Sequence, residues 1–470
     1  MKIKFLRKDP ENMRLILIFT GWSTGPEVGA GIDIPGWDVA VAYDFTELNP
    51  DTSFLDSYYT VYLFGWSLGV FAASRTLPHE RITAAFAVNG TTDPVNDIFG
   101  IPMAIYNGTA ENLNERNLMK FRIRMMRDRT AYEKASALFP DNGNAAIIDN
   151  LRDQLIVIRN ASAIPDFNLP EGTNNGMSPL PWVRAYISKN DRIFPPDNQK
   201  RAWSRDPDVE IVELDDAHYT DLAQIVRSVI SDPTKVSRQF SKASVSYDTH
   251  AIAQYSAAIK LATLLGERKP VTNGSVLEIG CGTGLFTKEY AGILHPRRAT
   301  FVDITATGPF GIAENEEYYI EDAERWIEKQ TCAWDTIVSA SAIQWFADIP
   351  RFLHLCARRL KDNGILAIST FLPGNMGELD ELRPSPLLYP KADQLREWME
   401  RDFDYVMIRE DCIKVEFRSA REMLMHLKHT GVAGSAPTRK LNMSEMSHLR
   451  SLTYRPVYVT GKKKRSIETD

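Results

Sequence analysis

The sequence predicts an α/β protein with two consecutive domains, and three observations support this prediction. The chain has 470 residues, which is too many for one ordinary domain. In its first half, an apolar segment at 60–64 leads into the turn G-W-S-L-G at 65–69 and then into a helical pattern at 70–77. In its second half, an apolar segment at 276–279 leads into the glycine turn G-C-G-T-G at 280–284.

Composition and charge argue against a nucleic-acid-binding, membrane-spanning or secreted protein. The formal net charge is −6, which gives no reason to expect a nucleic-acid partner. No apolar run approaches membrane-spanning length, and the N-terminal segment lacks the apolar core of a signal peptide. The four cysteines have no metal-pair or disulfide spacing. We therefore expect reduced thiols, a cytoplasmic protein, no membrane partner and no bound metal.

We assign residues 1–232 to the first domain, whose strand pattern together with the G-W-S-L-G turn predicts an α/β-hydrolase fold. Buried-strand patterns occur at 14–20, 37–43, 60–64, 81–88, 182–187 and 209–214. Two G-x-S-x-G sequences are present, and a nucleophilic serine needs a strand, a sharp turn and a helix in succession. Ser67 meets this requirement. Ser23 does not, because Pro26 and further glycines prevent a helix from starting there.

An acid and a histidine are expected to complete a catalytic triad with Ser67. The chain order in this fold is serine, acid, histidine. Asp191 and His218 follow the last two strand patterns, so both belong at the sheet edge that carries Ser67. This predicts an esterase in which His218 deprotonates Ser67 and Asp191 orients the imidazole. The backbone N–H groups of Trp22 and Leu68 are the candidate oxyanion donors.

The strand pattern lapses between about residues 92 and 180, where we expect a cap over the catalytic serine. Within this region, the segment 116–129 combines cations with apolar residues that fit one helical face. Arg122, Arg124 and Arg127 are therefore candidates for docking an acidic partner. The alternative is an ordinary solvated helix face.

The second domain is assigned residues 233–470, and its glycine turn predicts a site for a nucleoside-like cofactor. The spacing of Gly280, Gly282 and Gly284 is not that of a dinucleotide site. Glu278 precedes the turn, where a carboxylate would repel a pyrophosphate but could accept hydrogen bonds from a loop or an amino group.

Acidic residues also stand at the ends of the next two strand patterns, 300–302 and 318–321. At such positions Asp303 could accept hydrogen bonds from two ribose hydroxyls, and Asp322 could bond an adenine amino group. Each acid alone could be an ordinary helix cap, but at successive strand ends they favour a cofactor site. Two more strand patterns follow at 335–339 and 365–370.

The motifs of both halves resemble known families. The pattern E-x-G-x-G-x-G resembles motif I of the class I methyltransferases, a Rossmann-like fold that uses S-adenosyl-L-methionine (SAM). The second half is similar to the BioC family of malonyl-[acyl-carrier protein] O-methyltransferases, through R-Q-F-S-K-A-S-V-S-Y-D at 238–248, S-A-I-Q-W at 341–345 and L-K-H-T-G at 427–431. The first half resembles the BioG pimeloyl-[acyl-carrier protein] methyl ester esterases, through F-T-G-W at 19–22, the G-W-S-L-G turn and N-G-T at 89–91.

These resemblances imply a bifunctional enzyme of biotin synthesis. It would methylate the free carboxylate of malonyl-[acyl-carrier protein] with SAM and cleave the methyl ester of pimeloyl-[acyl-carrier protein]. Phe240, Tyr247, Gln344 and Trp345 are the candidates to cover the acyl substrate of the methyltransferase. Two alternatives stay open: a general carboxylesterase fused to a small-molecule methyltransferase, and a chain in which one half is a non-catalytic scaffold that binds the carrier.

Overall fold

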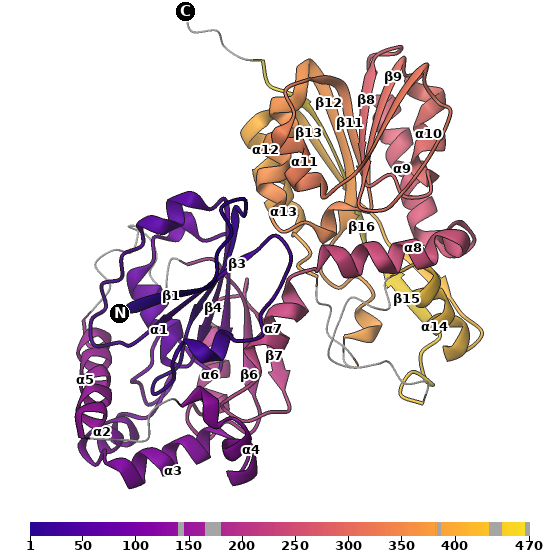
Figure 1. Cartoon of the computed structure of the whole chain (residues 1–470). Coiled ribbons are helices and arrows are strands. Elements are labelled where there is room, and N and C mark those ends of the chain that lie inside the picture. Colours follow the sequence, from indigo (N-terminus) through magenta and orange to yellow (C-terminus); the bar gives the residue numbers. More distant parts are fainter. Residues whose placement is uncertain (140–144, 165–179, 381, 383–386, 432–443, 466–470) are drawn as a thin grey trace, which may run out of the picture. The chain divides into compact units, whose positions relative to one another are not determined.

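The computed structural model describes residues 1–139, 145–164, 180–380, 382, 387–431 and 444–465. The chain forms two compact units, Met1–Val226 and Arg227–Asp470, and each is built on one seven-stranded sheet (Figure 1). The division falls a few residues before the expected boundary at 232, which coincides with the start of helix α8 (Pro233–His250). None of the helices in the described part of the chain is long and apolar enough to cross a membrane.

The sheet of the first unit has the order β1-β3-β2-β4-β5-β6-β7. Its strands are β1 (Lys2–Arg7), β2 (Arg14–Phe19), β3 (Asp38–Tyr43), β4 (Thr60–Trp66), β5 (Ala84–Val88), β6 (Trp182–Ser188) and β7 (Glu210–Leu214). β1 pairs antiparallel with β3, and all other pairs are parallel. The central strands are buried along their whole length, as expected of a parallel sheet with both faces covered.

Helices separate these strands, as in other α/β folds. α1 (Leu68–Thr76) follows β4, α6 (Pro196–Trp203) follows β6, and α7 (Leu222–Val229) follows β7. The segment between β5 and β6, where the sequence predicted a cap, is helical in its described part. It contains α2 (Met103–Glu111), α3 (Glu115–Met125), α4 (Arg129–Lys134) and α5 (Ala145–Ser162). α2, α3 and α4 lie at the same end of the unit (Figure 1).

The sheet of the second unit has the order β10-β9-β8-β11-β12-β16-β13. Its strands are β8 (Ser275–Ile279), β9 (Arg298–Asp303), β10 (Asn315–Ile320), β11 (Trp334–Ala340), β12 (Leu360–Phe371), β13 (Phe403–Glu410) and β16 (Pro456–Lys463). β16 runs antiparallel to both of its neighbours, and the other pairs are parallel. The strand order reverses between β8 and β11, and a ligand of such a sheet binds at the carboxyl ends of the strands around this point.

Helices cover both faces of the second sheet with separate apolar cores. The first core includes side chains of α11 (Ala323–Lys329), α12 (Ile349–Arg359) and α13 (Ala392–Asp402). The second includes side chains of α9 (Ile252–Glu267) and α10 (Leu285–Leu294). Both faces of the sheet are therefore covered by helices, which leaves the carboxyl ends of its strands to border a ligand.

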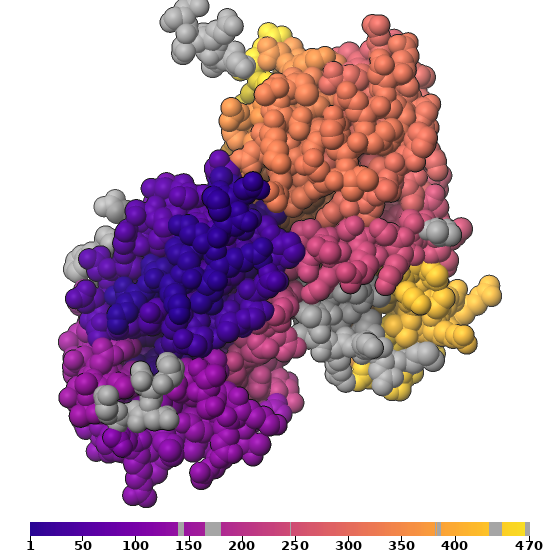
Figure 2. Space-filling view, viewed as in Figure 1, coloured from indigo at the N-terminus to yellow at the C-terminus, as the bar shows by residue number. Residues whose placement is uncertain are grey.

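Helix α8 crosses one end of the second sheet (Figure 1). On its other side lie α14 (Ala420–His429) and the strand pair β14 (Ile413–Glu416) and β15 (Ser451–Tyr454), which share a third apolar core. In the space-filling view, α8 forms a band between the sheet and α14 (Figure 2). α8 is thus placed to cover a ligand bound at the strand ends.

Candidate active sites

Ser67 occupies a sharp, strained turn between β4 and α1. Its φ of 59° and ψ of −127° are unusual for a residue with a side chain. Its two flanking glycines leave the space that this turn requires. A Cβ on Gly65 would lie 2.9 Å from Cα of Val70, and a Cβ on Gly69 would lie 2.3 Å from the carbonyl oxygen of Phe19. The G-x-S-x-G pattern is therefore needed sterically at this position.

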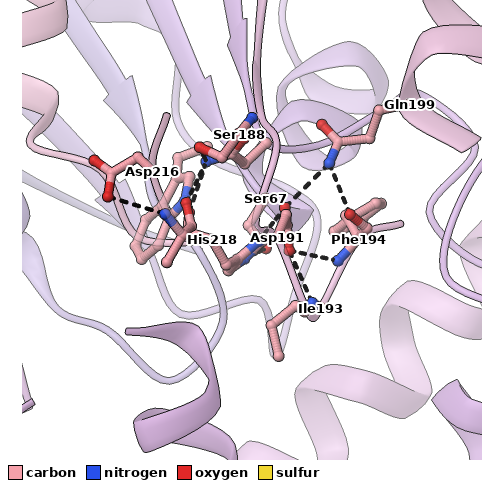
Figure 3. Close-up of polar contacts among 11 residues, drawn as sticks. Ser67, Ser188, Asp191, Ile193, Phe194, Gln199, Asp216 and His218 are labelled. Atoms are coloured by element: carbon pink, nitrogen blue, oxygen red, sulfur yellow. Dashed lines mark hydrogen bonds and ion pairs between the residues drawn. The ribbon is translucent and has the colours of Figure 1, made fainter. Parts of the chain in front are cut away.

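The structure brings together the three residues that the sequence predicted as a triad (Figure 3). Nε2 of His218 lies 2.9 Å from Oγ of Ser67, and Nδ1 of His218 lies 2.8 Å from Oδ2 of Asp191. Because a carboxylate can only accept, Nδ1 carries the proton and Nε2 is free to accept the serine proton. The side chains of Asp191 and His218 are fully buried, so this hydrogen-bonded chain is shielded from water.

The carboxylate of Asp191 is held by further contacts that the sequence did not reveal. Its Oδ1 accepts hydrogen bonds from the backbone N–H groups of Ile193 and Phe194, at 2.8 and 2.9 Å. Nε2 of Gln199 donates to Oδ2 at 3.1 Å. The ring of Phe194 also lies parallel to the imidazole of His218, with 6.1 Å between centroids. These contacts fix the acid in the position that orients the imidazole (Figure 3).

Asn89 ties the acid strand to the histidine loop. Its Nδ2 donates to Oγ of Ser188 at 2.9 Å and to the carbonyl oxygen of His218 at 2.8 Å. Its Oδ1 accepts from the backbone N–H of Ser188 at 2.7 Å. Asn89 is the first residue of the N-G-T motif at 89–91. This motif marked the position in the sequence, but it did not show that Asn89 would bind Ser188 and His218.

The two candidate oxyanion donors flank Ser67. Leu68 is the first residue of α1. Trp22 follows Gly21, whose added Cβ would lie only 3.2 Å from Cβ of Ser67. The indole Nε1 of Trp22 donates to the carbonyl oxygen of Leu151 on α5 at 2.8 Å, which anchors this loop to the cap region. The assignment of their backbone N–H groups as oxyanion donors stays a prediction.

The prediction that Arg122 docks a partner is wrong. Only 4% of Arg122 is exposed, and its Nη2 donates to the carbonyl oxygen of Ser23 at 3.3 Å. Its guanidinium also lies over the ring of Phe139, 4.8 Å from the centroid. Arg122 therefore faces the interior of the first unit, where it fastens α3 to the loop that follows β2.

The other two docking candidates are exposed. Arg124 lies on the open face of α3, and 55% of the Arg127 side chain is exposed. Arg127 also donates to the carbonyl oxygen of Asp215, close to the histidine loop. The expected single helix over 116–129 is interrupted, because α3 ends at Met125 and the side chain of Asp128 caps α4. The segment 172–181 is polar and rich in glycine and proline, which predicts a connector, and it lies largely outside the described residues.

The second unit contains a cavity of about 560 Å³ at the carboxyl ends of β8, β9 and β11. Its walls include five of the six predicted cofactor residues: Glu278, Gly280, Gly282, Asp303 and Asp322. Gly284 is not among the lining residues. It caps α10 with a φ of 81°, and a Cβ there would lie 2.5 Å from the ring of Phe310. Its role is therefore to shape the turn.

Asp303 holds the glycine turn. Its Oδ2 accepts from the N–H of Gly282 at 2.8 Å, and its Oδ1 accepts from the N–H and the hydroxyl of Thr305 at 2.8 and 2.7 Å. Each carboxylate oxygen can accept more than one hydrogen bond, so a ligand hydroxyl can also bind. Asp322 caps α11 by accepting from the N–H of Glu324 at 3.0 Å. Both acids border the cavity, as the sequence predicted.

Glu278 is buried and hydrogen-bonded to helix α10. Its Oε2 accepts from the hydroxyls of Thr287 and Tyr290, both at 2.7 Å. Burial raises the pKa of Glu278 to about 8, an effect that Asp303 reinforces and that the two hydrogen bonds oppose. Burial thus favours the protonated, neutral form of this carboxyl group.

Replacing Glu278 with glutamine is expected to stabilise the ligand-free protein at pH 9 by several kcal/mol and to have little effect at pH 5. The folded-state pKa of about 8 lies above the ordinary value of 4.5. The folded state therefore binds more protons than the unfolded state between these values, and its stability falls as pH rises through this range. Urea unfolding at several pH values measures the effect. Parallel pH profiles for both proteins would contradict it.

The four residues expected to cover the acyl substrate gather beside the cavity. Phe240 and Tyr247 project from α8, and their rings are 6.4 Å apart. The ring of Trp345, in the turn Ile343–Trp345, meets Phe240 edge-on at 5.6 Å. These three aromatic residues line the cavity. Gln344 does not line it. Its Nε2 donates to the carbonyl oxygen of Ser341 at 2.6 Å.

Comparison with known proteins assigns each half to a type of enzyme. Residues 1–225 match the family model of the pimeloyl-ACP methyl esterase BioG, and residues 247–431 match that of a methyltransferase domain. A malonyl-[acyl-carrier protein] O-methyltransferase of Bacteroides fragilis is 31% identical over 478 residues, which cover 97% of this chain and 94% of that protein. A relative with the same name from Porphyromonas gingivalis is 33% identical, covering 43% of this chain and 80% of its own.

A solved structure is also similar to the first half. The crystal structure of BioG from Haemophilus influenzae is 32% identical to this chain, with a TM-score of 0.41. The match covers 47% of this chain and 95% of that one.

Proposed function

The chain belongs to the family of malonyl-[acyl-carrier protein] O-methyltransferases and matches BioG over residues 1–225, and from this premise we propose that it catalyses two steps of biotin synthesis. The second unit methylates the free carboxylate of malonyl-[acyl-carrier protein], and the first hydrolyses the methyl ester of pimeloyl-[acyl-carrier protein]. The main support for this proposal is that the similarity to a malonyl-[acyl-carrier protein] O-methyltransferase extends over both units of this protein. In addition, the first unit contains the hydrogen-bonded triad of Ser67, His218 and Asp191. Four free cysteines support a cytoplasmic location.

In the esterase, the proposed reaction begins at Oγ of Ser67. His218 takes the serine proton while Oγ attacks the ester carbonyl, and Asp191 stabilises the imidazolium that forms. The N–H groups of Trp22 and Leu68 stabilise the oxyanion. His218 then gives its proton to the departing methoxide, and methanol leaves. The same residues activate water for hydrolysis of the acyl-enzyme.

In the methyltransferase, the chain binds and orients its two ligands. The cavity volume is suitable for a ligand of the size of SAM, and the carboxylates at its edge suit ribose hydroxyls and amino groups. We assign Asp303 to the ribose and Asp322 to the adenine. When bound, SAM supplies an electrophilic methyl group on a sulfonium. Phe240, Tyr247 and Trp345 exclude water around the acceptor, which makes its carboxylate a better nucleophile.

Growth without biotin tests the pair of activities. One bacterial strain should lack its malonyl-carrier methyltransferase, and a second should lack its pimeloyl-ester esterase. We expect the full chain to restore growth of both strains, and the Ser67→Ala variant to restore growth only of the first. Failure to restore either strain, with the protein expressed and folded, would contradict the proposal.

The carrier protein is proposed to dock beside the esterase through exposed cations. Replacing Arg124 and Arg127 together with glutamate is expected to lower kcat/KM for carrier-bound ester by about 10- to 100-fold, because it repels an acidic partner. Hydrolysis of a small soluble ester should be unchanged in the single variant Arg124→Glu, which separates docking from any effect of Arg127, because Arg127 pairs with Asp215 and Asp216 beside the histidine loop. Arg297→Glu, at an exposed site in the second unit, is the control. Equal rates of the wild type and all variants on carrier-bound ester would exclude docking at this surface.

A further inference from the structure

A second, much smaller cavity adjoins the cofactor cavity. Its volume is about 30 Å³, which is enough for a group of the size of a water molecule or a carboxylate. Five residues line both cavities and so form the junction between them: Phe240, Tyr247, Gln254, Ser341 and Trp345. A group placed in the small cavity would therefore face a ligand in the large one.

Two polar atoms of this junction lack hydrogen-bond partners within the described residues. They are Oγ of Ser341 and Oε1 of Gln254, and both are buried. An unsatisfied buried polar atom costs about 1–3 kcal/mol, so such atoms at a cavity indicate a polar ligand. The amide of Gln254 can be turned by half a rotation, which would present its NH₂ group instead of its oxygen.

The backbone of Ser341, which borders this junction, has a strained conformation. Its φ is 54°, in the left-handed region that residues with a side chain rarely adopt. Its backbone N–H donates to the carbonyl oxygen of Ser369 at 3.0 Å, and its own carbonyl oxygen accepts from Nε2 of Gln344 at 2.6 Å. Strain of this kind persists where the surrounding structure imposes it, and it is concentrated at functional sites.

The junction is also uncharged. None of the described residues that line the small cavity is a lysine, arginine, aspartate or glutamate. Methylation removes the negative charge of a carboxylate, so a fixed cation would stabilise the reactant more than the transition state. Neutral donors can hold the carboxylate without stabilising the reactant in this way. The positive charge that attracts the carboxylate is supplied by the sulfonium of the cofactor when it is bound.

We propose that the small cavity receives the free carboxylate of the malonyl group, and that Ser341 and Gln254 hold it there by neutral hydrogen bonds. This inference rests on the proposed methyltransferase function. The hydroxyl of Ser341 and the amide NH₂ of Gln254 donate to the acceptor. One carboxylate oxygen forms a bond to the methyl carbon while the bond from that carbon to sulfur breaks, and the electron pair of the broken bond stays on sulfur. No proton is transferred.

Two variants test this anchor. Ser341→Ala removes one donor, and we expect it to raise KM for malonyl-[acyl-carrier protein] or lower kcat by about 10-fold, with the affinity for SAM unchanged. Gln254→Glu keeps the shape but places a negative charge beside the acceptor. It should lower kcat/KM for the carrier substrate by at least about 100-fold at pH 8, with a smaller loss at lower pH as the new carboxylate becomes protonated. Its affinity for SAM, a cation, should be equal or higher.

Calorimetric titration with SAM and steady-state kinetics with malonyl-[acyl-carrier protein] supply both readouts. Thr263→Ala, on the exposed face of the helix that carries Gln254, is the matched control. Unchanged kinetics of both junction variants, with an active wild-type enzyme, would overturn the anchor alone. A parallel loss of SAM affinity in both would assign the two residues to the cofactor instead. A wild-type protein that binds SAM but leaves malonyl-[acyl-carrier protein] unmethylated would overturn the proposed function and this inference with it.

Discussion

Replacing Ser67 with alanine is expected to lower hydrolysis of pimeloyl-[acyl-carrier protein] methyl ester by at least about 1,000-fold and to leave methylation unchanged. The hydroxyl lies 2.9 Å from Nε2 of His218 and is the group that would form the acyl-enzyme. Without it, only substrate binding and transition-state stabilisation by the proposed oxyanion donors are left, as in other triad enzymes that lose their nucleophile. The rate of ester loss from the carrier measures the effect, and the methyltransferase rate of the same preparation reports its integrity.

Ser23→Ala is the matched control for this experiment. Ser23 is the central serine of the other G-x-S-x-G sequence, and it lies in the loop after β2, where no α-helix follows. We expect this variant to retain esterase activity near the wild-type level. If Ser67→Ala kept its activity and Ser23→Ala lost it, the assignment of the nucleophile would be reversed.

Replacing Asp303 with alanine is expected to weaken SAM binding by about 100-fold or more and to abolish methylation at ordinary SAM concentrations. The substitution removes the proposed acceptor for the ribose hydroxyls. It also removes the acceptor for the N–H groups of Gly282 and Thr305, which shape the edge of the cavity. Hydrogen bonds to a charged group contribute about 1.5–3 kcal/mol each, so the loss of two is sufficient for this effect.

Calorimetric titration with SAM measures this affinity directly. Asp303→Asn keeps one carbonyl oxygen in place and should cause a smaller loss, of about 10-fold. Both variants should hydrolyse the pimeloyl ester at the wild-type rate, because the triad belongs to the other unit. Wild-type SAM affinity in Asp303→Ala would place the cofactor elsewhere in the cavity.

Much of both sites could be predicted because parallel α/β sheets place the ends of their strands at one edge. Ser67, Asp191 and His218 are far apart in the sequence, yet each follows a strand of the same sheet, so chain order alone predicted their proximity. The same reasoning predicted that Asp303 and Asp322 would border the cavity beside the glycine turn. In these cases the sequence pattern and the sheet topology constrain the position of the side chain strongly.

Features that depend on tertiary packing were missed. Helical periodicity predicted that Arg122 is a surface cation. The prediction failed because the guanidinium lies over the buried ring of Phe139, a tertiary contact that a sequence pattern does not show. β1 was missed because its short pattern contains three cations and no continuous apolar run. The junction of the two cavities could not be predicted from the sequence, because Gln254 and Ser341 belong to a helix and a turn that are distant in sequence.

The mass of the intact carrier protein tests the central claim most directly. Full-length protein would be given malonyl-[acyl-carrier protein] with SAM in one reaction and the methyl ester of pimeloyl-[acyl-carrier protein] in another. We expect the mass of the first carrier to rise by the replacement of one hydrogen with a methyl group, and the mass of the second carrier to fall by the same amount. A pimeloyl ester that stays intact, or a malonyl carrier whose mass does not change, would contradict the assignment of both activities to this chain.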